Sequence, residues 1–153
     1  MNSPRPQESG CFSVDMDARF RDLDAMGHVN NSVYFTYFEE GRKHLFHHIM
    51  QSKGIQDFPF IIAHAGCDYR KAVQLGDPLC LKMEVSEMGE KSFTLAYRLV
   101  HRENPSVVFA RGTTVQVCYD YKERRTIPIP PALKAKLAPY AAAPAVNPAE
   151  NTP

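Results

Sequence analysis

The sequence predicts an α+β domain in which an antiparallel sheet of about five strands wraps around one long helix. Only one long segment, from about residue 32 to 51, carries apolar residues at helical spacing. The segments before and after it alternate between apolar and polar residues, and short turns join them. At 153 residues, the chain has the length of one domain. Such a helix must be largely covered by the sheet, because nothing else can bury its apolar surface.

The first predicted strand begins at residue 12, after a flexible N-terminal segment over residues 1–10. Polar residues separate apolar ones at every second position: Phe12, Val14, Met16, Ala18 and Phe20. This period of two is typical of a strand with one buried face. The strand is expected to end in a loop at 22–28, which contains a glycine and several side chains that favour turns.

The helix predicted at 32–51 has one face made of residues spaced three or four apart, namely Tyr34, Phe38, Gly41, Leu45 and Ile49. Its start offers three side-chain oxygens that could cap free backbone N–H groups: Asn30, Asn31 and Ser32. A glycine inside a helix costs up to about 1 kcal/mol relative to alanine. We therefore expect a neighbouring strand to approach the helix closely at Gly41.

An antiparallel meander is predicted after the helix. Residues 60–65 and 69–75 are expected to form one interrupted strand with a bulge at Gly66. Further strands are separated by segments rich in turn-forming residues at 76–78, 89–91 and 103–106. Successive strands with such short connections pair in antiparallel fashion.

The folded domain is predicted to span residues 11–138. Pro131 suits the first turn of a short helix that continues over 132–137. The tail at 139–153 is rich in proline and alanine, and we expect it to be disordered.

Composition excludes several classes of function. The 18 basic and 17 acidic residues give a net charge of +1, and no nucleic-acid-binding signature is present, so we expect no nucleic-acid partner. No stretch has the roughly 18 apolar residues needed to span a membrane, and no secretory signal is visible. The four cysteines form no C-x-x-C pair, which favours reduced thiols and a cytoplasmic location.

The densest group of polar and special residues lies between the first strand and the helix: Asp22-Leu23-Asp24-Ala25-Met26-Gly27-His28-Val29-Asn30-Asn31. A helix start presents unpaired N–H groups that can polarise a carbonyl or hold an anion. A carboxylate beside such donors supplies the two parts that acyl transfer needs, a base or nucleophile and an oxyanion site. The simpler interpretation is that these aspartates cap turns and that His28 is structural.

This segment, continued by Ser32-Val33-Tyr34, resembles the N-terminal motif of 4-hydroxybenzoyl-CoA thioesterase-like proteins, which are hotdog-fold acyl-CoA thioesterases. Weaker similarities to the family follow at 91–93 and 110–120. The resemblance implies that Asp24 is the catalytic carboxylate, acting as nucleophile or general base. It also implies that the backbone N–H of Asn31 polarises the thioester carbonyl and that His28 positions water or exchanges protons.

The same resemblance implies substrate contacts at four further positions: Asn30, Tyr34, Lys91 and Ser92. The last two match a segment that touches the CoA phosphates in some members. A branch of the family uses a helix glutamate, so Glu39 and Glu40 remain alternatives to the aspartate. No G-x-S-x-G elbow is present, which leaves a serine-based route to thioester hydrolysis unsupported.

The resemblance further implies an acyl-CoA substrate, no cofactor or metal, and a homodimer or homotetramer with active sites at the dimer interface. Exposed sheet edges independently favour an oligomer. A non-catalytic acyl-CoA-binding domain and a thioesterase acting on acyl carrier protein remain alternatives. His44 and His48 could share a metal, and residues 122–125 could touch a phosphate, but solvated surface residues are the simpler interpretation of both.

Overall fold

The structure, a computed structural model, describes residues 3–4, 10–51 and 59–142. The predicted connection at 52–57 and most of the predicted flexible start lie outside these residues. So does the tail from residue 143. No helix in the described ranges combines the length and the apolar character needed to cross a membrane.

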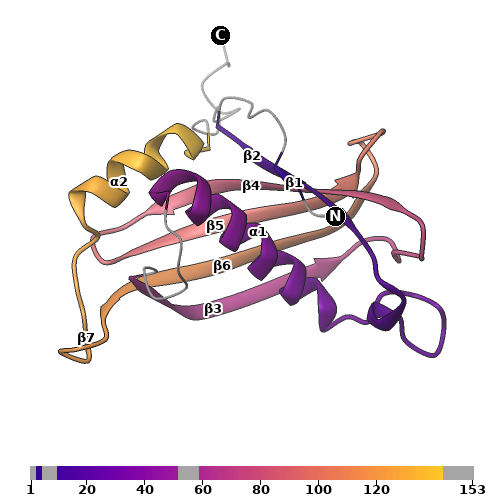
Figure 1. Cartoon of the computed structure of the whole chain (residues 1–153), viewed down its shortest axis with the longest axis horizontal. Coiled ribbons are helices and arrows are strands. Elements are labelled where there is room, and N and C mark those ends of the chain that lie inside the picture. The colour runs from indigo at the N-terminus through magenta and orange to yellow at the C-terminus, as the bar shows by residue number, and fades with distance from the viewer. Residues whose placement is uncertain (1–2, 5–9, 52–58, 143–153) are drawn as a thin grey trace, which may run out of the picture.

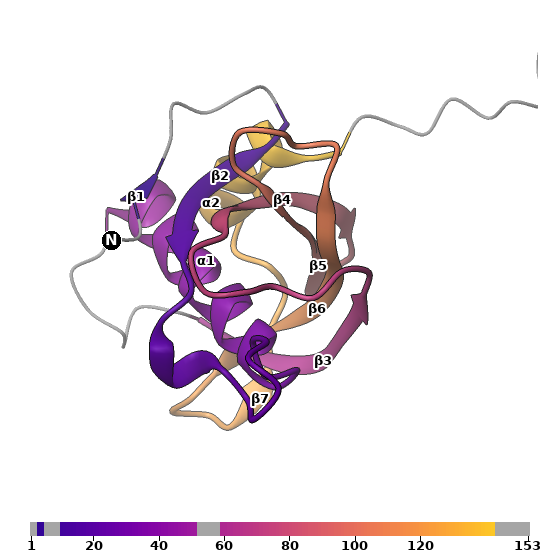
Figure 2. The same ribbon diagram turned by 90° about the vertical axis from the view of Figure 1, so that its right-hand side faces the viewer.

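Antiparallel strands form one sheet, as predicted, in the order β1-β2-β4-β5-β6-β3. Figures 1 and 2 show that the sheet is curved and that α1 lies on its concave side. The strands are β1 (Ser3–Pro4), β2 (Phe12–Asp17), β3 (Phe60–Tyr69), β4 (Pro78–Met88), β5 (Ser92–His101), β6 (Val108–Asp120) and β7 (Arg125–Thr126), which pairs with β6. The helices are α1 (Val33–Met50) and α2 (Pro131–Leu137), with 3-10 turns η1 (Phe20–Asp22) and η3 (Ala138–Tyr140).

The first strand is shorter than its alternating pattern predicts. β2 ends at Asp17, and Phe20 is 82% exposed instead of buried. A local hydrogen bond explains this early end of the strand. The Asp22 carboxylate accepts it from the Arg19 backbone N–H at 2.8 Å. This bond stabilises the turn η1, which directs the chain away from the sheet before the pattern is complete.

The predicted bulge at Gly66 is wrong. β3 runs without a break from Phe60 to Tyr69, and its pairing with β6 shifts between Ile62 and His64 instead. After Tyr69 the chain leaves the strand, and Val73 accepts a hydrogen bond from Val29 at 2.9 Å. Segment 70–75 therefore lies beside the loop that precedes α1, and this contact forms one wall of the candidate site described below.

Two glycines allow α1 to lie close to the sheet. A Cβ atom at Gly41 would collide with the side chains of Leu81 and Met83 on β4. A Cβ atom at Gly112 on β6 would collide with the Phe38 ring of α1. The close approach expected at Gly41 is therefore confirmed, and the core of the protein lies between this face of α1 and the concave face of the sheet.

A buried polar network joins α1 to the sheet. The Tyr97 hydroxyl lies 3.2 Å from an Arg42 guanidinium nitrogen, which donates to it, and 2.7 Å from the Thr114 hydroxyl. The Tyr97 ring also stacks on Phe38 with centroids 4.5 Å apart. Buried polar groups stabilise a fold only when all of them have partners, so the Tyr97 hydroxyl completes this network.

We expect Tyr97→Phe to lower the free energy of unfolding by about 1–3 kcal/mol, because Arg42 and Thr114 would each lose a buried partner. Urea unfolding followed by circular dichroism measures this change. Tyr119→Phe is the matched control, since no described residue bonds the Tyr119 hydroxyl. Equal stability of the two variants would show that the network contributes nothing.

The folded chain continues past the expected boundary at residue 138. Tyr140 in η3 is buried, and its ring meets Phe12 edge-on with centroids 5.8 Å apart. The backbone N–H of Ala142 donates to Val85 of β4 at 2.9 Å. One aromatic side chain within the proline- and alanine-rich segment thus extends the packed region to at least residue 142.

Candidate active site

The loop between β2 and α1 contains two aspartates with different surroundings. The Asp22 carboxylate accepts hydrogen bonds from the Arg19 N–H and from the Tyr37 hydroxyl at 2.9 Å. Its backbone oxygen accepts a further bond from Asn30 at 2.8 Å. Asp22 therefore holds the loop against α1, which is the turn-stabilising role considered for both aspartates.

Asp24 is exposed, and only one of its carboxylate oxygens is engaged. Its Oδ1 accepts hydrogen bonds from the backbone N–H groups of Met26 at 2.9 Å and His28 at 3.3 Å. Its backbone N–H donates to the His28 oxygen at 2.8 Å, so the turn is closed on both sides. Within the described residues, Oδ2 has no hydrogen-bond partner. The carboxylate is thus oriented through one oxygen, and the other remains accessible.

The start of α1 leaves one backbone donor available. The Asn30 side-chain oxygen accepts bonds from the Ser32 N–H at 3.0 Å and from the Ser32 hydroxyl at 2.8 Å. Its backbone oxygen accepts a bond from the Val33 N–H at 2.9 Å. Among the residues with described positions, the Asn31 N–H donates to none. A free N–H at a helix start, where the helix dipole is positive, is the expected donor to an oxyanion.

Asp24 and Asn31, which lies two residues before α1, line the same pocket, which has a volume of about 300 Å³. Two other predicted site residues, His28 and Tyr34, line it as well. The wall opposite them comes from the end of β3 and from the segment after it: Tyr69, Arg70, Lys71 and Ala72. The pocket therefore combines a carboxylate, a helix N-terminus, two aromatic rings and two cations.

The wall formed by Tyr69, Arg70 and Lys71 was not predicted from the sequence. The Tyr69 hydroxyl donates to the Asn31 backbone oxygen at 2.7 Å, and its ring meets Tyr34 edge-on with centroids 4.9 Å apart. Tyr69 thus holds the start of α1 in position. The sequence did contain a signal, because Arg70 and Lys71 directly follow a strand. However, the strand segment predicted over 69–75 included both of them.

Burial raises the pKa of the phenols of Tyr34 and Tyr37 above their ordinary value near 10, and for Tyr37 the hydrogen bond to Asp22 adds to the effect. The unfolded chain therefore loses these protons at lower pH than the folded chain. The free energy of unfolding should consequently fall as pH rises through 10. We expect a weaker fall in Tyr37→Phe, and urea titrations at pH 8 and pH 10.5 measure it. An equal fall in both proteins would contradict the assignment.

The remaining predicted residues do not reach this pocket within one chain. Ser92 begins β5, whose other end faces the pocket, so Lys91 and Ser92 lie roughly 20 Å away along the strand. Glu39 is exposed on α1, and Glu40 forms an ion pair with Lys43. No three His, Cys, Asp or Glu side chains in the described ranges are grouped closely enough to hold a metal ion, and the pair His44 and His48 gains no third ligand there.

Comparisons with known proteins find similarity to thioesterases and CoA-thioester hydrolases. A sequence model of the thioesterase-like superfamily matches residues 18–137. The 1,4-dihydroxy-2-naphthoyl-CoA hydrolase of Synechococcus elongatus is 27% identical over 76% of this chain and 87% of that protein. The long-chain acyl-CoA thioesterase FadM of Escherichia coli is 26% identical over 82% of this chain and 96% of that protein. A Thermus thermophilus thioesterase solved with coenzyme A and zinc superposes with a TM-score of 0.74 and 29% identity, over 84% of this chain and 92% of that one.

Proposed function

We propose, since the chain belongs to the thioesterase-like superfamily, that it hydrolyses acyl-CoA to a free acid and CoA with the Asp24 carboxylate. Relatives named as CoA-thioester hydrolases support thioester hydrolysis as its activity. One observation supports Asp24 as the catalytic carboxylate. Asp24 has one oxygen fixed by two N–H groups and one accessible oxygen, and it shares a pocket with Asn31, whose N–H donates to no described residue.

The carboxylate can act in either of two ways. As a general base it takes a proton from water, and the hydroxide adds to the thioester carbon. The C–S bond then breaks, and the CoA thiolate takes up the proton that Asp24 accepted. As a nucleophile Asp24 itself adds to the carbon and expels CoA, and water then hydrolyses the mixed anhydride. Both routes need an accessible carboxylate oxygen.

Both routes also place negative charge on the carbonyl oxygen, and the Asn31 N–H is the proposed donor to it. A fixed donor at a helix N-terminus stabilises such an oxyanion without having to reorganise. Tyr69 contributes by bonding the Asn31 carbonyl, which fixes the peptide next to the donor. His28, whose backbone bonds Asp24, is proposed to position the attacking water.

We propose that two copies of the chain pair through β3. This strand is a ten-residue edge of the sheet, and most of its residues are exposed, including Ile61 at 36% and Ile62 at 41%. No described strand pairs with its outer side. A long, apolar, unprotected edge promotes association with another strand, and a twofold axis satisfies both copies at once.

Such a dimer would bring the separated site residues together. Antiparallel pairing of two β3 strands sets the Phe60 end of one copy beside the Tyr69 end of the other. Lys91 lies at the Phe60 end, because its backbone oxygen accepts a bond from Cys118, which pairs with Phe60. Lys91 and Ser92 would therefore approach the partner's Asp24 pocket, where the phosphates of a bound CoA could extend to them.

Product analysis separates this proposal from its two alternatives. Equimolar protein and acyl-CoA are incubated, and free acid and CoA are quantified, with acyl carrier protein carrying the same acyl group in a second arm. Hydrolysis predicts equal amounts of acid and CoA, and faster release from acyl-CoA than from the carrier protein. Stoichiometric binding without products would identify a binding domain, and faster release from the carrier protein would reassign the substrate.

A further inference from the structure

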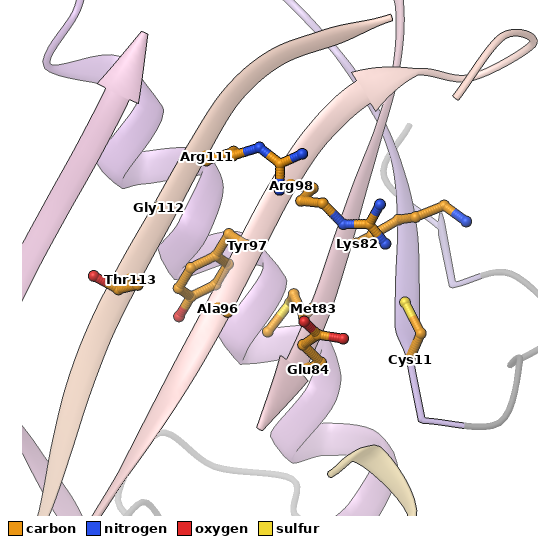
Figure 3. Close-up of a pocket in the computed structure, with 10 residues that line it drawn as sticks. All are labelled: Cys11, Lys82, Met83, Glu84, Ala96, Tyr97, Arg98, Arg111, Gly112 and Thr113. Atoms are coloured by element: carbon orange, nitrogen blue, oxygen red, sulfur yellow. The ribbon is translucent and has the colours of Figure 1, made fainter. Parts of the chain in front are cut away.

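Three cations lie in a row across the outer face of the sheet, away from α1. Strand pairing sets Lys82 of β4 opposite Arg98 of β5, and Arg98 opposite Arg111 of β6. Their chain neighbours Met83 and Tyr97 are buried toward α1, so the three cations point the other way. Figure 3 shows their charged ends side by side. These three residues are called the cation row below.

Of these three cations, Arg98 and Arg111 lie directly opposite each other, which is electrostatically unfavourable without an anion. Like charges directly opposite on neighbouring strands destabilise a sheet. Within the described ranges, neither the Arg98 nor the Arg111 guanidinium makes an ion pair or hydrogen bond. Glu84 lines the same face and Asp68 of β3 lies opposite Arg111, but neither carboxylate forms an ion pair with an arginine within the described residues. Two adjacent guanidinium groups therefore have unused donors, and planar guanidinium groups suit phosphate oxygens well.

The cation row borders a cavity of about 410 Å³. Apart from Glu84, its remaining lining is uncharged and includes Ala96, Thr113 and Cys11. Three neighbouring strands span roughly 10 Å, which is longer than a single phosphate group needs. A concave site of this volume fits a small ligand better than a flat protein surface.

We propose that the cation row binds a ligand that carries two or more phosphate groups. The ligand is either the phosphate-bearing end of CoA or a free diphosphate such as a nucleoside diphosphate. The first choice rests on the proposed hydrolase function, and the CoA phosphates would then lie here and not at the partner's Lys91. The row is separate from the Asp24 pocket, although the two are near each other. Arg111 pairs with Asp68, and the two residues that follow Asp68 in the chain, Tyr69 and Arg70, line the Asp24 pocket.

Calorimetric titration with inorganic pyrophosphate, ADP and CoA tests the proposal in a buffer free of phosphate. Arg98→Gln and Arg111→Gln should each weaken pyrophosphate binding at least about tenfold, because each removes a charge-assisted contact. Glu84→Gln should strengthen it by removing a repulsive charge. Lys136→Gln, which removes one charge from exposed α2, is the matched control and should change nothing. Added chloride should weaken binding by screening.

Two outcomes would overturn the proposal. One is the absence of pyrophosphate binding at millimolar concentration. The other is equal affinity in wild type and in the Arg98→Gln/Arg111→Gln double variant. If that double variant changes the oligomeric state while pyrophosphate gives no heat, the face is an interface between copies and the proposal is also overturned.

Kinetics identify the source of the phosphates. A higher KM for acyl-CoA in the double variant, with kcat unchanged, assigns the row to the substrate's own CoA end. An unchanged KM together with lost ADP binding assigns it to a free diphosphate. Asp24→Asn should bind pyrophosphate like wild type, so failure of the hydrolase assignment and failure of this inference are distinguishable.

Discussion

Asp24→Asn is expected to lower kcat for acyl-CoA hydrolysis by at least about 100-fold while the fold stays intact. The asparagine side-chain oxygen can still accept the bonds from Met26 and His28, so the turn should survive. Only the negative charge and its basicity are removed. Steady-state release of CoA measures the effect, and circular dichroism checks the fold.

Asp22→Asn is the matched control in the same loop. Asp22 bonds Arg19 and Tyr37 and does not line the pocket, so its amide variant should keep kcat within a few-fold of wild type. Asp24→Ala separates the two roles further, because it removes the turn bonds as well as the charge and should also lower stability. If Asp24→Asn hydrolyses at the wild-type rate, the carboxylate must be sought on α1, with Glu39 tested first.

Ile62→Lys should convert an oligomer to monomers and remove most of the activity. A lysine on the exposed edge of β3 puts a charge where the proposed partner strand pairs, and edge lysines are a common protection against such pairing. The folded monomer should tolerate it, since Ile62 is 41% exposed. Light scattering measures the mass in solution, and CoA release at the same protein concentration measures the activity.

Ala135→Lys provides the control for the added charge, because Ala135 is exposed on α2, away from β3. It should leave both mass and activity unchanged. An Ile62→Lys protein that keeps its oligomeric mass would show that β3 is not the interface. A monomer with full activity would show that the pocket of one chain is sufficient, and Lys91 would then have no role through a partner.

Much of the fold was predictable because burial imposes a simple period on each element. The alternation in β4 and β5 matches their buried and exposed faces, and Gly41 correctly indicated a close helix–sheet contact. The errors arose where a few side-chain contacts override the period. The Asp22 bond to Arg19 ends β2 early, and Tyr140 keeps the C-terminal segment packed.

The site was predictable only as far as it is local in the sequence. Asp24, His28, Asn31 and Tyr34 lie within eleven consecutive residues, so one motif contains them all. Tyr69 reaches Asn31 from 38 positions away, and that contact depends on where β3 ends. The cation row was not visible for a related reason, because it exists only once the register of three strands is known.

Hydrolysis of acyl-CoA by this chain underlies every role proposed for the Asp24 pocket. The most direct test is the steady-state release of CoA by the wild-type protein from short, medium, long and aromatic acyl-CoA substrates. Turnover of at least one of them is expected, with kcat in the usual enzymatic range of about 1–1000 per second. Saturable binding of these compounds without release of CoA from any of them would contradict it.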